Sequence, residues 1–462
     1  GRLRALGRRV QIYVDENDLT RVSDELLRDV VQTFDERVFP TSARLWGRAV
    51  DIDGDGRFTI LLTSWLARLG GGSLPVDGFV RGADLDPGLA APFGNRCDMM
   101  YLNANLRPGP HLRTVLAHEY THAVTFSRKV APGPDGLHGL EEEGWLDEAL
   151  AHLVEDVHGF TRSNLDYRVS AFLSAPERYR LVVEDYYTAD LFRSHGNRGS
   201  TYLFLRWCSE QYGPKVLPAL IGSKRRGIAN LEAVTGQPFA RLYRQWSASL
   251  YWNALIAPGD RSETAKPPPS ESNDWLMVGP RTSTIEPDGP VENWVSAGTS
   301  SHYALVNASP TGVVSIEVSA PPNAALQVTA IPLPADRPEL TLRVLPTVDD
   351  QGSVRIKVDV REHTGVAVRL DSMAWEPLVP AADAHASGFR RGRLDGPALA
   401  EALGGLNLPE RGSLSAATIP LPELRPGDGP VVFKLVGTDA KGRKVAAWAE
   451  IDLRTVETRE KE

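Results

Sequence analysis

The chain changes character at one stretch of sequence, IAPGDRSETAKPPPSESND (256–274), and this break limits what it can fold into. Proline, serine and charged residues cluster there without helix or strand periodicity, which is typical of a linker. A chain of 462 residues is also too long for one ordinary domain. We therefore expect a domain over 1–256, a linker over 257–275, and β-sandwich domains over 276–378 and 379–462, the last with a charged tail.

The part before the linker mixes strand and helix patterns, which predicts an α/β (α+β) fold. Short apolar runs predict strands at 10–14, 57–63 and 98–102, a helix is expected from about Ser23, and further helical patterns cover 111–128, 144–158, 200–212 and 238–254. The glycine-rich stretch GGGSLPVDG (70–78) predicts a loop.

The part after the linker consists of short alternating runs separated by Pro, Gly and Asp turns, which predicts antiparallel sandwiches. The expected strands are 313–319, 325–331, 340–345, 353–360, 365–370, 431–437 and 444–453, the last two forming a hairpin across DAKGR.

Composition argues against two classes of function. The net charge of −8 does not indicate a nucleic-acid-binding surface. The sequence contains no run of eighteen apolar residues, so it does not predict a membrane span.

Because the first residue is Gly rather than Met, we expect that an export signal preceded it. Cys97 and Cys208 are compatible with two buried thiols or with one disulfide.

The sequence HEYTH (118–122) carries the main chemical prediction. Residues four apart lie on one face of a helix, so His118 and His122 can reach one metal ion. Glu119 lies about 100° round the helix from His118, beside such an ion, where a base for a metal-activated water should be. Two surface histidines on an amphipathic helix are the alternative, but a second amphipathic segment, GWLDEALA (144–151), adds the acid Glu148 after a loop.

HExxH followed by a helix of the type W-L-(N/D)-E-(G/A)-x-(A/S) resembles the gluzincin metallopeptidases. The chain is also similar to hyicolysin-like secreted bacterial peptidases in its DxDxDG-ILLT segment, its Gly-rich loop and the helix that starts YLF and continues to Tyr212-Gly213. The resemblance covers roughly residues 10–250. It implies a zincin-type domain, Zn²⁺ held by His118, His122 and Glu148, and Glu119 as catalytic base.

The same resemblance implies hydrolysis of peptide bonds in proteins or peptides, in a secreted or cell-surface protein of bacterial type. No Gly-x-Met-Glu-Asn-type segment, which captures the substrate's amino terminus in gluzincin aminopeptidases, precedes the HEYTH helix, so we expect an endopeptidase. A gluzincin aminopeptidase is one alternative. Another is a non-catalytic cell-surface or matrix-binding protein that uses the peptidase-like domain as a scaffold. No pattern predicts the cleavage specificity, the role of the β domains or the oligomeric state.

Four further features leave alternatives open. His152 is interpreted as a partner of a ligand, an extra ligand or a partly exposed histidine. The strand MMYLN (99–103) is either an edge on which a peptide substrate pairs or an interior strand.

The acidic turn with Asp51, Asp53 and Asp55 begins like a calcium loop, but position twelve of the loop is Leu62 instead of Glu. A Ca²⁺ site and a plain turn therefore both remain as interpretations of this segment. The resemblance implies an oxyanion donor after the third ligand, and His195 is the candidate, with Arg198 and Tyr202 as alternatives.

Overall fold

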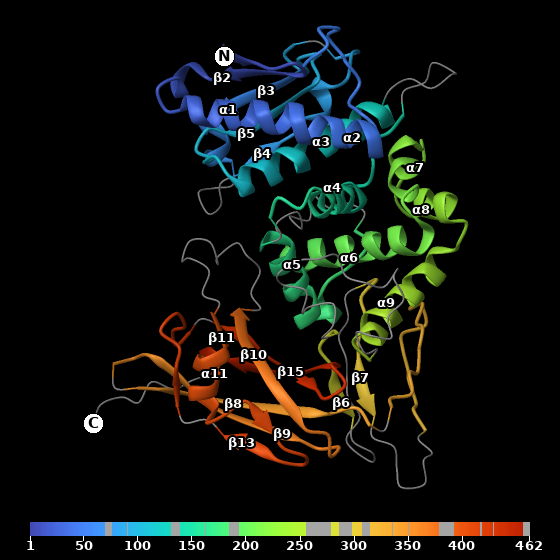
Figure 1. Cartoon of the computed structure of the whole chain (residues 1–462). Coiled ribbons are helices and arrows are strands. Elements are labelled where there is room, and N and C mark those ends of the chain that lie inside the picture. Colours follow the sequence, from blue (N-terminus) through green and yellow to red (C-terminus); the bar gives the residue numbers. More distant parts are fainter. Residues whose placement is uncertain are drawn as a thin grey trace. The chain divides into compact units, whose positions relative to one another are not determined.

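The computed structural model describes residues 1–69, 76–89, 91–130, 139–161, 163–183, 194–255, 279–285, 298–306, 315–334, 336–349, 351–377, 392–415, 418–427 and 429–455. The chain forms two compact units (Figure 1). The first unit comprises Gly1–Arg168 and Leu181–Leu242, and the second comprises Val169–Arg180 and Tyr243–Glu462. The predicted linker over 257–275, most of the predicted Gly-rich loop and the end of the charged tail lie outside the described residues.

The first unit is built on a five-stranded mixed sheet. Its strands are β1 (Arg2–Leu6), β2 (Val10–Val14), β3 (Phe58–Thr63), β4 (Gly78–Phe79) and β5 (Met99–Asn103), in the order β1-β2-β3-β5-β4. The pairs β2–β3 and β3–β5 are parallel, whereas β1–β2 and β4–β5 are antiparallel. Strand β5 therefore lies inside the sheet, and the interpretation of MMYLN as an edge is wrong. The edge strand beside it is β4.

The first unit also contains helices, whose ends follow local sequence signals. They are α1 (Asp24–Thr33), α2 (Phe39–Leu45), α3 (Pro110–Val130), α4 (Gly144–His158), α6 (His195–Tyr212), α7 (Val216–Gly222) and α8 (Gly227–Thr235), while α5 (Ser163–Ser174) and α9 (Phe239–Leu255) run from one unit into the other. Ser23 caps α1 by accepting a hydrogen bond from the backbone N–H of Leu26. Helix α4 ends at Gly159, whose φ of 63° suits glycine. These bounds confirm the predicted strands and helices of the first unit.

Helix α3, which carries HEYTH, is fixed to the sheet by aromatic packing. Tyr120 lies within the motif and is buried. Its ring meets those of Phe34 and Phe58 edge-on, with centroids 4.9 and 5.0 Å away. On another side α3 contacts α4, which in turn contacts α6 (Figure 1). The motif helix is thus held between the sheet and a layer of helices.

The second unit is rich in sheet. One sheet has the order β11-β10-β15-β16 with β12 beside β10, a second joins β8, β9, β13 and β14, and a third pairs β6 with β7. The strands are β6 (Ser283–Ile285), β7 (Ala304–Val306), β8 (Leu340–Val348), β9 (Val354–Glu362), β10 (Val368–Pro377), β11 (Gly392–Asp395), β12 (Asn407–Leu408), β13 (Ser413–Ser415), β14 (Ile419–Pro420), β15 (Pro430–Asp439) and β16 (Lys444–Asp452), with helix α11 (Gly396–Leu403) between β11 and β12. The two larger sheets share one apolar core. The chain is therefore α+β with a sheet-rich C-terminal region.

Most strand predictions for the second unit are confirmed, including the hairpin of β15 and β16. The predicted strands at 313–319 and 325–331 are not: the described residues 315–334 contain no strand, and their side chains are mostly exposed. The boundary predicted between 378 and 379 falls among residues that are not described. Strands on both sides of it, β10 and β15, pair in one sheet.

Candidate metal centre

The polar residues of HEYTH are buried in the middle of α3. His118 and Glu119 are each 8% exposed and His122 is 7% exposed. Leu116 and Ala123, on the same helix, are fully buried around them. Because buried polar groups are costly without partners, each of these side chains needs a hydrogen bond, a counter-charge or an ion.

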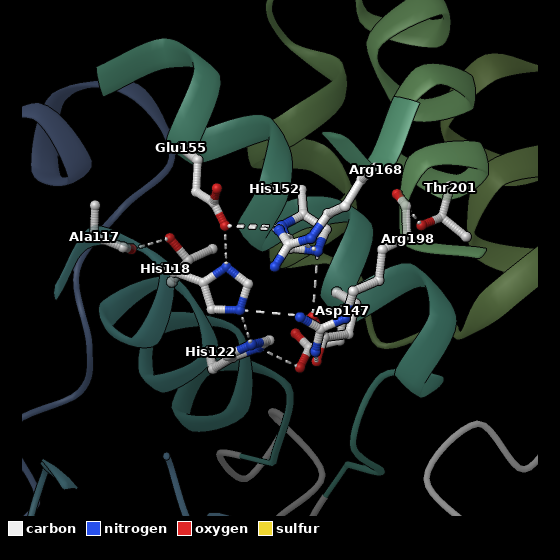
Figure 2. Close-up of polar contacts among 11 residues, drawn as sticks. Ala117, His118, His122, Asp147, His152, Glu155, Arg168, Arg198 and Thr201 are labelled. Carbon is white, nitrogen blue, oxygen red and sulfur yellow. Dashed lines mark hydrogen bonds and ion pairs between the residues drawn. The ribbon is translucent and has the colours of Figure 1, made fainter. Parts of the chain in front are cut away.

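The two imidazoles face each other through their Nε2 atoms, which are 3.1 Å apart. Their Nδ1 atoms are already engaged: that of His118 lies 2.7 Å from Oε1 of Glu155, and that of His122 lies 2.7 Å from Oδ2 of Asp147 (Figure 2). A carboxylate accepts but does not donate, so in neutral rings Nδ1 carries the hydrogen and Nε2 the lone pair. Two lone pairs thus point at one position, which suits a cation.

Glu148, from α4, completes this position. Its Oε2 atom lies 3.6 Å from Nε2 of His118, and ligand atoms of His118, His122 and Glu148 all lie within 4.8 Å of one another. Oε2 is buried and has no hydrogen-bond partner among the described residues. The other oxygen, Oε1, accepts a hydrogen bond from Arg198 at 3.2 Å. An orphaned carboxylate oxygen beside two imidazole lone pairs is compatible with a metal ion such as zinc, which proteins hold with ligands of these types.

The charges around the position also favour a cation. Buried carboxylates of α3 and α4 surround it and outnumber the guanidinium groups that they contact. Burial alone would raise the pKa of Glu148, but Arg198 and the nearby imidazoles outweigh it and lower that pKa to about 2. Burial would lower the pKa of His122, yet Asp147, Glu148 and Glu119 outweigh it and raise the pKa to about 10. The pocket therefore attracts positive charge: without an ion His122 keeps a proton, and a bound cation would displace that proton and leave both rings neutral.

Glu119 differs from the other carboxylates of the site. Burial raises its pKa, because its neighbours only partly offset the loss of water. Its side chain lies against the backbone of β4 at Gly78. A carboxylate close to the position where an ion fits is placed to accept and return a proton.

Behind the two histidines lies a second group of contacts, which includes His152. This side chain is fully buried, so its interpretation as a partly exposed histidine is wrong. Its Nδ1 atom lies 2.8 Å from Oε1 of Glu155, the same oxygen that contacts His118, and Arg168 places Nη1 3.2 Å from its Nε2 atom (Figure 2). Burial and Arg168 lower the pKa of His152 to about 3, which keeps the ring neutral.

His118, His152 and Glu155 form a second cluster of potential ligand atoms. The distances of 2.7 and 2.8 Å to Glu155 are hydrogen-bond lengths, so we interpret these contacts as hydrogen bonds that support His118. Sequence reasoning did not single out Glu155 or Arg168. Glu155 was detectable, because it follows Glu148 by two helical turns and so shares its face. No local pattern marks Arg168.

The three candidates for an oxyanion donor lie on α6 and have different surroundings. The ring of His195 meets that of Tyr167 edge-on, with centroids 4.5 Å apart, and its role as donor stays a prediction. Arg198 contacts Glu148. Tyr202 is buried and donates its hydroxyl hydrogen to Asp156 at 2.9 Å, which agrees with a packed core aromatic.

The acidic turn brings together a different set of residues from the predicted one. Oxygens of Asp51, Asp53 and Asp98 lie within 4.8 Å of one another. Asp55 is instead a hydrogen-bond acceptor for Gln11. Asp98 was missed because it precedes the distant strand β5. Its burial raises its pKa to about 7, and Asp53 and Asp51 add to this shift.

Both cysteines are free thiols, Cys97 half-buried and Cys208 buried, so the disulfide alternative is wrong. Among the described residues, no helix is both long and apolar enough to cross a membrane.

Comparisons with known proteins give one informative match, to a metalloprotease. No family model matches the chain. The neutral metalloprotease ShpI of Staphylococcus hyicus is 25% identical over 182 residues, which cover 37% of this chain and 38% of that protein. A solved structure, the ApaA protein of Bordetella pertussis, matches 28% of this chain and 100% of its own, with 16% identity and a TM-score of 0.19, too low to inform the fold. The partial match to ShpI, together with the His118, His122 and Glu148 cluster, supports a relationship to metallopeptidases.

Proposed function

We propose that the chain is a zinc-dependent peptidase in which His118, His122 and Glu148 hold the ion and Glu119 is the general base. One observation carries this proposal: two imidazole lone pairs and an orphaned carboxylate oxygen converge on one buried position. The match to a neutral metalloprotease supports it. By the same resemblance we propose that the protein acts outside the cytoplasm.

Each residue of the site has a distinct task in this proposal. When bound, zinc would acidify a water molecule and polarise the substrate carbonyl. As water adds to the carbonyl carbon, Glu119 takes its proton, and as the C–N bond breaks Glu119 gives a proton to the leaving amine. Asp147 and Glu155 hold the imidazoles in the required tautomer. Arg198 orients Glu148.

The edge strand β4 is the proposed docking place for an extended substrate. It is the last strand of the sheet order, and its backbone contacts Glu119 at Gly78. A peptide that pairs with this edge would bring its own carbonyl groups beside the site. Binding along a strand does not need a free amino terminus, which favours an endopeptidase.

Metal analysis combined with protein digestion tests the proposal. Protein purified without added metal should contain about one zinc per chain and should digest casein, and a chelator should stop digestion. Glu119→Gln should keep the zinc and lose digestion, because an amide cannot accept the proton. Glu25→Gln, an exposed residue on helix α1, is the matched control. If no zinc binds even when it is supplied, the proposal is overturned; zinc without any digestion favours a non-catalytic scaffold.

Peptides with blocked ends distinguish endopeptidase from aminopeptidase. An internally quenched peptide, acetylated at its amino terminus and amidated at its carboxyl terminus, should be cleaved. Cleavage only of the matched peptide with a free amino terminus would assign an aminopeptidase instead.

A further inference from the structure

The backbone of Gly78 lies directly against the side chain of Glu119. Gly78 is the first residue of β4, and a methyl group added to it would lie 2.5 Å from Cγ and 2.8 Å from both Cδ and Oε1 of Glu119. Carbon atoms do not approach so closely, so any other residue at 78 would force one of the two partners to move. The φ angle of Gly78 is not in the left-handed region. The need for glycine here comes from this close approach and not from backbone conformation.

Several contacts hold β4 in place beside α3. The carboxylate of Asp77 lies 2.8 Å from Nε2 of His111, in the first turn of α3. Asn103, at the end of β5, donates its backbone N–H to the carbonyl of Asp77 at 2.9 Å and its side-chain amide to that of Val76 at 3.1 Å. Gly78 itself is paired with Leu102 of β5. The strand is therefore fixed by α3 and by the sheet.

The far end of Glu119 is the movable partner. Its Cα belongs to the middle of α3, but its carboxylate sits at the end of a flexible side chain. The chain that follows β4 also approaches α3, since a methyl group on Gly82 would meet the ring of Phe126 at 2.9 Å. Two close approaches along one helix indicate that the segment from Gly78 to Gly82 lies tightly against α3.

We propose that Gly78 is a positioning residue for Glu119: the missing side chain lets the backbone of β4 form a wall that keeps the carboxylate beside the metal position. This inference rests on the proposed role of Glu119 as general base. In this proposal the edge strand β4 has two roles. It pairs with the substrate, and its first residue, Gly78, limits where the carboxylate of Glu119 can point.

Gly78→Ala tests the proposal. The methyl group should displace the Glu119 carboxylate and leave zinc content and thermal midpoint close to wild type. A shift of about 1 Å in a reacting group costs roughly 100-fold in rate, so kcat should fall on that scale with a small change in KM. Gly222→Ala is the matched control, because a methyl group there would meet no atom within 4 Å. A kcat for Gly78→Ala within a few-fold of wild type would overturn the proposal.

A double-mutant cycle separates an action through Glu119 from an action on the substrate. In the Glu119→Gln background, Gly78→Ala should not lower the residual peptidase activity any further. The side chain that the methyl group displaces no longer works as a base there. An additive loss, or a rise in KM as the main effect, would show that Gly78 acts on peptide binding instead.

A crystal structure of metal-free Gly78→Ala gives a readout that does not depend on activity. The carboxylate of Glu119 should have moved, whereas β4 and the 3.1 Å separation of the two Nε2 atoms should be as in wild type. A displaced strand with an unmoved Glu119 would overturn the positioning role. Failure of the proposed function would be recognised by different results: wild-type protein that binds no zinc, or a Glu119→Gln variant that still cleaves peptides.

Discussion

The Nδ1 atom of His118 lies 2.7 Å from Oε1 of Glu155, a residue 37 positions later in the chain. The same oxygen lies 2.8 Å from Nδ1 of His152 and 3.5 Å from Nη1 of Arg168. One carboxylate oxygen therefore fixes the tautomers of two imidazoles, and a guanidinium group compensates its charge. Helix α4 thus supplies both Glu148 and the support for His118.

Glu155→Gln should weaken zinc binding. An amide has no negative charge and cannot accept from both imidazoles as a carboxylate does, so His118 loses part of its orientation and basicity. Loss of such a partner typically lowers metal affinity about 10- to 100-fold. Titration against a competing chelator measures this, with Glu25→Gln as control. An unchanged affinity would show that the contact does not support the metal position.

Lys129→Met should destabilise the first unit. Lys129 and Glu142 are buried, with Nζ 2.8 Å from Oε2, and Nζ also donates to the carbonyls of Ser223 and Arg225. Removing one member of a buried ion pair leaves an uncompensated charge and costs about 3–5 kcal/mol. Urea denaturation measures the loss.

The double variant Lys129→Met/Glu142→Gln serves as the control for that prediction. It removes both charges and should recover part of the lost stability. If the single variant lost less than about 1 kcal/mol, the pair would not contribute as its burial suggests.

The sequence predicted those parts of the site that depend on spacing within one helix. HEYTH sits on α3 with the two histidines on one face, and GWLDEALA begins a helix at Gly144, both as expected. The spacing of Glu148 and Glu155, two turns apart on the helix that begins at Gly144, could also have indicated Glu155. It could not indicate Arg168 or Asp98, because their contacts depend on how separate elements pack. The roles of His118, Glu119, His122 and Glu148 remain predictions.

The strand predictions show the same limit. Alternating runs at 340–345 and 353–360 became β8 and β9, which pair with each other. Residues 315–334 also alternate, but the structure shows no strand in them. A strand is defined by its partner, and alternation along one segment does not supply one.

The stability of the first unit should fall as pH rises from about 4 to about 7 through the contribution of Asp98. Burial raises the pKa of Asp98 to about 7 in the folded state, whereas an unfolded aspartate titrates near about 3.9. Between these values the folded state binds the additional proton, so raising the pH disfavours folding. The thermal midpoint of Asp98→Asn, relative to wild type, should increase across this window and level off above a pH of about 7. A constant difference would contradict the shift.

Calcium should raise the thermal midpoint in mildly alkaline buffer if the acidic cluster binds it. A ligand selective for the folded state stabilises by mass action, and Asp51, Asp53 and Asp98 supply the clustered oxygens. Asp98→Asn should abolish the effect, while Asp55→Asn, whose carboxylate accepts from Gln11, should retain it. If millimolar calcium left the thermal midpoint of the wild type unchanged, the acidic segment would be a plain turn and not a calcium site.

His195→Ala tests the predicted oxyanion donor. Losing one such donor costs about 100- to 1,000-fold in kcat, and because His195 is not among the proposed ligands, zinc content should stay the same. Arg198→Ala is the informative comparison: Arg198 donates to Glu148 at 3.2 Å, so its loss should lower zinc affinity as well as turnover. Single-turnover rates at saturating zinc separate the two effects. If His195→Ala kept its kcat within a few-fold of wild type, the donor would be Arg198, Tyr202 or a residue outside these three, and the rate of Arg198→Ala at saturating zinc would decide whether Arg198 has that role.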